Sequence, residues 1–222
     1  MLVRIPSLFP GRTAKVLVTY EITRKEIVAP VDPSIYSVPD RLPRALRQYL
    51  GPSPYIESRH SKIRSLAKEV VGDQQCAWDQ VEAIYDYVRE NVEYKEGSLK
   101  GALAALRDGY GDCEELSSLF IAMCRAQQIP ARMVWVPDHC YPEFYLVDDR
   151  GEGHWFPCQA AGTRAFGSMP EMRPILQKGD SFRVPEYDKP QRYVAEFLKG
   201  NVIRGGGQPE VAWIREYVQP DG

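Results

Sequence analysis

The sequence has no apolar run near the roughly 20 residues that a membrane-spanning helix requires. It also lacks a charge excess of either sign. Lysine and arginine number 28 and aspartate and glutamate 30, which gives a net charge of −2 and a pI near 6.0. A chain with this balance has no electrostatic footprint for general nucleic-acid binding. We therefore expect no membrane span and no nucleic-acid partner.

Histidine and cysteine are scarce. The 222 residues include three histidines and five cysteines, and no two of the cysteines form a Cys-x-x-Cys pair. An odd cysteine count without framework spacing argues against a disulfide-stapled fold and favours a reducing compartment. The first residues, MLVRIPSLFPGR, lack the apolar core and cleavage site of a signal peptide. We expect a cytoplasmic protein with at least one free thiol.

The chain does contain helical periodicity, followed by strand-like runs. Apolar residues recur at helical spacing in four segments, and short β-branched or aromatic runs follow them, two of these joined by the hairpin loop DDRGEG. Helices followed by strands predict an α+β domain. The expected helices span 58–72, 76–94, 98–109 (capped by Ser98 and closed by Gly109) and 113–128, and the expected strands span 131–136, 142–149 and 154–159.

We expect three segments along the chain. Residues 1–57 hold a strand at 14–28, where polar and apolar residues alternate, and then a proline-rich connector. Residues 58–160 form the core. Residues 161–222 are an extended segment that packs on the core and carries a last strand at 211–218.

Cys113 opens one of the expected helices, directly after the candidate N-cap Asp112. The free N–H groups and the dipole of a helix start favour a thiolate over a thiol. The next two residues, Glu114 and Glu115, would raise the thiol pKa unless they point away. A histidine partner is therefore needed to activate the sulfur.

Two other readings of Cys113 stay open at this point. It shares a helical face with Leu116 and Phe120, so it could be a small buried apolar residue. It could also bind zinc together with His139, Cys140 and Cys158. Neighbouring residues of a strand point to opposite faces, which argues against that zinc site, so we expect no metal.

Three motifs resemble the transglutaminase-like superfamily: GDCEELSSLFIAMCRAQQIPAR, HCYPEFY and HWFPCQ. The resemblance covers about residues 58–159. It implies a papain-like core in which a cysteine opens a helix that packs on an antiparallel sheet. Members of the family use Cys, His and Asp for acyl transfer, without a cofactor.

Carried onto this chain, the resemblance makes Cys113 the nucleophile and His139 the general base and acid. Gln159 stands where the family usually has Asp. A group at this place accepts the Nδ1–H of the imidazole, so that the other nitrogen faces the thiol, and an amide carbonyl can do so without a charge. Tyr94 is the candidate second oxyanion donor, and Asp112 supports the helix start.

Four further polar residues have a weaker claim on the site. Asp148 and Asp149 lie at the hairpin, where we expect them to be solvated. His154 is expected at the surface, and His60 has a structural place near a helix start.

The resemblance implies hydrolysis of a peptide or amide bond through a thioester, with a protein or peptide as substrate. Two alternatives remain: a transferase that cross-links protein glutamine, and an inactive peptide-binding module on the same fold.

Overall fold

The structure, a computed structural model, describes residues 2–202, 206–216 and 218. The chain divides into two compact units, Met1–Ile22 with Ala195–Gly222, and Thr23–Val194. The helices and strands named below all belong to the second unit. Within the described residues, every helix is too short or too polar to cross a membrane.

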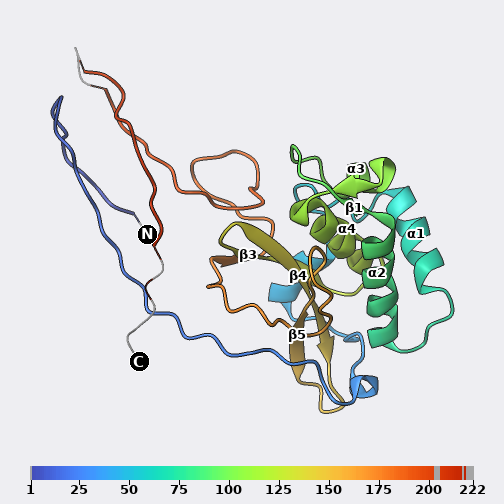
Figure 1. Ribbon diagram of the computed structural model, residues 1–222. Helices are drawn as coiled ribbons and strands as arrows, with labels where there is room; N and C mark the ends of the chain where they lie inside the picture. Colours follow the sequence, from blue (N-terminus) through green and yellow to red (C-terminus); the bar gives the residue numbers. More distant parts are fainter. Residues whose placement is uncertain (1, 203–205, 217, 219–222) are drawn as a thin grey trace. The chain divides into compact units, whose positions relative to one another are not determined.

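The expected α+β class is confirmed, with helices preceding most of the strands (Figure 1). The helices are η1 Pro33–Ile35, η2 Arg44–Leu50, α1 Ser61–Val71, α2 Ala77–Asn91, α3 Ala102–Asp108 and α4 Cys113–Ala126. The strands are β1 Glu93–Tyr94, β2 Tyr110–Gly111, β3 Ala131–Val136, β4 His139–Val147, β5 Gly153–Pro157 and β6 Gln177–Lys178.

The main sheet is antiparallel, with the strand order β5-β4-β3-β6. Strands β3 and β4 form a tight hairpin in which Val136 pairs with His139. The short strands β1 and β2 run parallel, and Tyr94 is level with Gly111. The sheet therefore brings His139 to the end of a hairpin, and the β1–β2 pair brings Tyr94 beside the start of α4.

Helix α4 is the centre of the fold. It contacts α1, α2 and α3 as well as β3 and β4 (Figure 1). All its residues from Glu115 to Arg125 are buried. Packing on every side holds the helix rigidly. The expected cysteine-first helix on an antiparallel sheet is therefore present, and the position of its first residue is fixed by the whole core.

A buried ion pair fastens segments outside the core motif to the far end of α4. Arg125 Nη2 lies 2.8 Å from Asp180 Oδ2, and the Arg125 side chain also donates to the carbonyls of Ala131 and Gly51. Both ionic groups are almost fully buried. Arg125 therefore holds two segments against the end of α4. One is the segment after β6, through Asp180, and the other is the connector before α1, through the Gly51 carbonyl.

Three local predictions are wrong. Residues 14–26 form no strand, and Ile27 makes only an isolated bridge to Met169. The described residues of 211–218 also lie outside any strand. Alternation signals a surface that suits a strand but does not supply the neighbouring strand that a ladder needs. Helix α3 begins after Gly101, not Ser98, whereas Gly109 does end it.

Candidate active site

The start of α4 is held by reciprocal hydrogen bonds. Asp112 Oδ1 accepts the N–H of Glu114 at 2.8 Å, and Glu115 Oε2 accepts the N–H of Asp112 at 3.2 Å. Together with the bond from the Glu115 N–H to the Asp112 side chain, this is a capping box. Glu115 Oε1 also accepts the N–H of Lys100 at 2.9 Å, which ties the helix start to the preceding loop. The predicted N-cap role of Asp112 is confirmed.

The two glutamates beside Cys113 are both engaged. Glu115 is buried in the capping box, and Glu114 forms an ion pair with Arg192. Burial raises the pKa of Glu114 to about 7, although Arg192 opposes the shift, and burial raises the pKa of Asp112 to about 6. Much of the negative charge expected near Cys113 is therefore paired or partly protonated near neutral pH.

The Cys113 thiol sits among hydrogen-bond donors. The pKa of Cys113 is lowered to about 4 by hydrogen bonds, first from the Cys140 side chain and then from His139 and the Cys140 backbone. Burial acts in the opposite direction and raises the pKa. Burial instead raises the pKa of Cys124, Cys140 and Cys158 well above the usual value. Among these four cysteines, the surroundings therefore favour the thiolate only at Cys113.

His139 and Cys140 both contact Cys113, although adjacent strand residues were expected to point to opposite faces. His139 is the first residue of β4 and follows Asp138, whose φ of 56° marks a left-handed turn. His139 and Cys140 are thus the first two residues of β4, and both reach the sulfur.

Gln159 lies on the other side of the imidazole. His139 Nε2 is 3.0 Å from Gln159 Oε1. The nitrogen differs from the one expected: Nε2 faces Gln159, which leaves Nδ1 for the sulfur. Burial lowers the pKa of His139, but hydrogen bonds to Cys113 and Gln159 outweigh it, so the pKa is raised overall. A raised imidazole pKa beside a lowered thiol pKa favours a thiolate–imidazolium pair.

Two side chains of α2 hold the backbone of Gln159. Tyr85 donates its hydroxyl hydrogen to the Gln159 carbonyl at 2.9 Å, and Arg89 donates to the same oxygen at 2.9 Å. The N–H of Gln159 donates to the Ala165 carbonyl at 2.8 Å. Gln159 is itself 5% exposed. It is thus a buried and anchored residue, well placed to orient a histidine.

Glu171 is a part of the site that the sequence did not reveal. Gln159 Nε2 donates to Glu171 Oε1 at 2.8 Å. The residue lies in the proline-rich run SMPEMRP, after the last motif of the family pattern. No spacing rule connects it to Gln159, so the sequence carries no signal by which it could have been found.

Tyr94 stands near the sulfur but not deep in the protein. Its side chain is about half exposed, and its backbone pairs with Gly111. Its pKa is raised, first by burial and then by the charge on Cys113. The hydroxyl therefore lies within electrostatic reach of the sulfur.

The hairpin residue Asp148 is not solvated as expected. Its side chain is buried, accepts the N–H groups of Arg150 and Glu152, and lies 3.0 Å from His154 Nε2. The N–H groups of the DDRGEG turn need an acceptor, and this carboxylate supplies one. Asp148, Glu152 and His154 form the one cluster of three potential metal ligands among the described residues. Cys113 and His139 are not in it.

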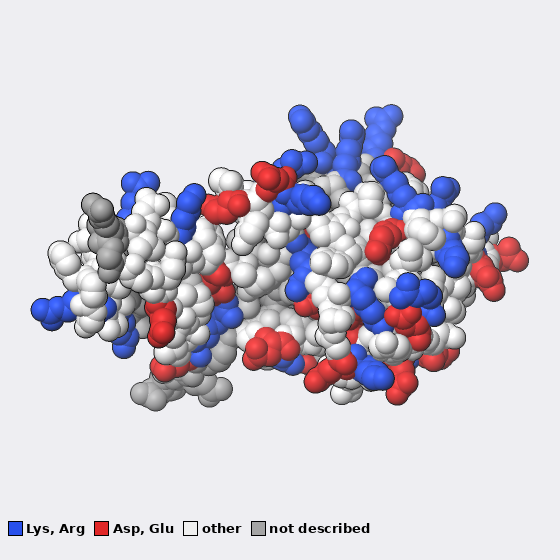
Figure 2. All heavy atoms as spheres, turned by 90° about the horizontal axis from the view of Figure 1, so that it is seen from above, with Lys and Arg blue, Asp and Glu red and all other residues white. Residues whose placement is uncertain are grey.

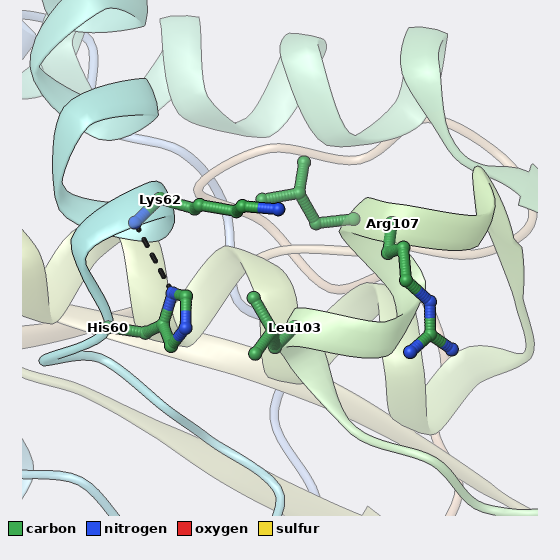
Figure 3. A pocket seen from close by; sticks show the side chains of 5 residues that line it. His60, Lys62, Leu103 and Arg107 are labelled. Carbon is green, nitrogen blue, oxygen red and sulfur yellow. Dashed lines mark hydrogen bonds between the residues drawn. The ribbon is translucent and has the colours of Figure 1, made fainter.

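Two surface hollows lie apart from these residues. One, of about 260 Å³, is open to solvent between α1 and α3, where His60 Nδ1 accepts the N–H of Lys62 as the N-cap of α1 (Figure 3). The other, of about 490 Å³, lies at the C-terminal end of α4 near Arg125. Neither is lined by Cys113, His139 or Gln159, so the chemistry and not cavity size identifies the site. Charges of both signs are intermixed on the face shown in Figure 2.

Comparisons with known proteins give one family match and similar solved structures. Residues 64–160 match the model of the transglutaminase-like superfamily. The chain is similar to a solved structure of a proposed cysteine protease from Cytophaga hutchinsonii, with 29% identity, a TM-score of 0.46 and coverage of 54% of this chain and 43% of that one. It is also similar to a proposed protease from Parabacteroides distasonis, with 15% identity, a TM-score of 0.37 and coverage of 55% and 29%. The chain thus spans less than half of either structure's length, and no curated protein matches it.

Proposed function

Residues 64–160 belong to the transglutaminase-like superfamily, and we propose that the chain is a cysteine hydrolase that cleaves a peptide or amide bond through a thioester. The observation that carries the proposal is the assembled row of Cys113, His139 and Gln159, in which the thiol pKa is about 4. A buried structural cysteine has its pKa raised instead, as Cys124 and Cys158 do.

The mechanism follows from the resting ion pair. The Cys113 thiolate attacks the carbonyl carbon of the substrate, and the C=O electron pair moves to oxygen. The backbone N–H of Cys113 and the hydroxyl of Tyr94 would stabilise that oxyanion. The imidazolium of His139 then protonates the leaving amine as the C–N bond breaks, which leaves a thioester on Cys113.

Hydrolysis of the thioester returns the enzyme to its starting state. Neutral His139 takes a proton from water, the hydroxide attacks the thioester carbonyl, and the thiolate leaves. Gln159 holds the imidazole through both steps by accepting the hydrogen of Nε2. Since Gln159 carries no charge, it stabilises the imidazolium less than the usual Asp would. We therefore expect a working but slower enzyme than a member with Asp.

Hydrolysis is preferred to transfer because the similar solved structures are described as proteases. The proposal can be tested with casein as the acyl donor. The wild-type chain is expected to generate new peptide N-termini, detected by mass spectrometry, and a covalent acyl adduct on Cys113. Cys113→Ala should abolish both, whereas Cys76→Ala, which alters a partly exposed cysteine outside the site, should retain them.

The same experiment separates the alternatives when a fluorescent primary amine is added. Incorporation of the amine into casein glutamine, without new N-termini, would make the chain a cross-linking transferase. Neither product, together with an inert Cys113, would overturn the enzyme proposal and favour a peptide-binding module.

A further inference from the structure

We propose that Glu171 is a positioning residue of this site: its carboxylate fixes the orientation of the Gln159 amide, and that amide fixes which nitrogen of His139 carries the hydrogen. The inference rests on the proposed function for its catalytic meaning. Its structural content can be measured without any activity.

The row of contacts is continuous. Cys113 is hydrogen-bonded to His139. His139 Nε2 lies 3.0 Å from Gln159 Oε1, and Gln159 Nε2 lies 2.8 Å from Glu171 Oε1. Both amide contacts have ordinary hydrogen-bond lengths. Gln159 therefore links the imidazole to a carboxylate.

The donor and acceptor rules give this row a direction. A carboxylate only accepts, so the amide group that faces Glu171 must be the NH₂ of Gln159. The carbonyl oxygen of Gln159 then faces His139, and an oxygen can only accept, so His139 Nε2 must carry a hydrogen. The other nitrogen, Nδ1, is left to exchange a proton with Cys113. This is the tautomer that the proposed mechanism needs.

Without Glu171 the amide could turn over with little cost. Its NH₂ would then donate to His139 Nε2, and the hydrogen of the neutral ring would move to Nδ1. A ring in that tautomer cannot accept a proton from the sulfur. The wrong tautomer of a catalytic histidine has a large cost in rate.

The second oxygen of Glu171 is buried and makes no hydrogen bond within the described part of the chain, but a cation lies beside it. Arg173 Nη2 lies 2.9 Å from Glu171 Oε2, and Arg173 Nη1 donates to the Pro137 carbonyl at 3.0 Å. Pro137 is two residues before His139, in the turn between β3 and β4. The contacts thus run from His139 through Gln159, Glu171 and Arg173 back to the turn that precedes His139. The ion pair with Arg173 thus keeps the carboxylate near the turn that precedes His139.

Glu171 also supplies the charge that Gln159 lacks. Its carboxylate is one of the groups that raise the pKa of His139. The usual Asp would place its charge in direct contact with the ring, whereas here the charge acts through an amide. Glu171 and Gln159 together thus divide the two tasks of the missing aspartate, which are charge and orientation.

A purely structural role is the rival explanation, since Glu171 could simply hold its segment against the sheet. The two roles differ in what they do to His139. A structural contact would change stability only. A positioning contact would change the tautomer of His139 and the titration of Cys113, and would do so only while Gln159 is present.

The first test is ¹⁵N NMR of the His139 ring in a Cys113→Ala background at about pH 8, where most imidazoles are neutral. With Glu171 present we expect the hydrogen on Nε2. Glu171→Leu, which removes the acceptor, should shift a large part of the population to the Nδ1–H tautomer. Glu171→Gln, which keeps an acceptor oxygen, should shift less. Glu186→Gln, at an exposed carboxylate of the following segment, should shift nothing.

The second test is the rate of alkylation of Cys113 against pH. Glu171→Leu should raise the midpoint by about one pH unit, a tenfold change in the ionisation constant. The same change in a Gln159→Ala background should have little effect, because the link to His139 is already broken. Thermal unfolding followed by circular dichroism shows that each variant is folded.

An unchanged His139 spectrum in Glu171→Leu, or an equal shift of the midpoint with and without Gln159, would overturn the positioning role. The proposed function would still stand if wild-type Cys113 titrates low. A changed tautomer together with an ordinary Cys113 titration would leave the positioning role intact and overturn the proposed enzyme.

Discussion

Replacing Gly111 with alanine tests how the chain shapes the start of α4. A Cβ atom at this position would lie 2.4 Å from Glu115 Cβ and 2.9 Å from Glu115 Cγ. Glu115 cannot give way freely, because its carboxylate binds the N–H groups of Asp112 and Lys100. The glycine two residues before Cys113 is thus required by the glutamate two residues after it.

The magnitude follows from these contacts. Carbon atoms in contact sit about 3.5–4.0 Å apart, so the glutamate or the loop must move by about 1 Å. Overpacking of this kind costs about 1–3 kcal/mol, and loss of an N-cap adds about 1 kcal/mol. We expect Gly111→Ala to lower the free energy of unfolding by about 2–4 kcal/mol, the sum of these two effects.

Urea unfolding, followed by tryptophan fluorescence, measures this loss. The matched control is Gly97→Ala, where the new methyl group meets open space, and its effect should stay within about 1 kcal/mol. A loss below about 0.5 kcal/mol for Gly111→Ala, the range of an ordinary surface substitution, would refute the account of the helix start.

Two further predictions concern a buried ion pair and a thiol. Arg125→Met leaves the carboxylate of Asp180 buried without its charge partner, so the free energy of unfolding in urea should fall by about 3–5 kcal/mol. The control Arg107→Met, at an exposed ion pair, should lower it by at most about 1 kcal/mol. Equal losses in the two variants would contradict the prediction. Cys140→Ala removes the first donor to the Cys113 sulfur, so the alkylation midpoint of Cys113 should rise by about one pH unit, the effect of one hydrogen bond to a charged group. An unmoved midpoint would show that Cys140 does not stabilise the thiolate.

The parts of the fold that the sequence predicts well are those with local causes. The helix that starts at Cys113 has its cap at Asp112 and its apolar face within a few residues, and both are present in the structure. The family motifs also place His139 and Gln159, and the structure brings their side chains to 3.0 Å. Short-range hydrogen bonds and helical periodicity decide these features, and both can be read directly from neighbouring residues.

What the sequence cannot supply is the partner that a residue meets across the fold. Residues 14–26 alternate like a strand but have no neighbouring strand in the structure. Glu171 lies 12 residues from Gln159 in the chain, beyond any motif, yet the two are in contact. Asp148 looks like a solvated loop residue, but its own turn buries it. In each case the structure around the residue depends on whether another part of the fold contacts it. The residue type alone does not show whether that contact exists.

The most direct measurement of the central claim is the rate of iodoacetamide alkylation of Cys113 between pH 3 and 10, followed by peptide mass spectrometry. The lowered pKa of Cys113 predicts a thiolate that is fully formed above a midpoint of about 4 and is lost as the pH falls through it. His139→Ala removes one donor and the positive charge, so the midpoint should move upward. A wild-type midpoint near 9, unchanged in His139→Ala, would show that no thiolate–imidazolium pair exists and would contradict the account.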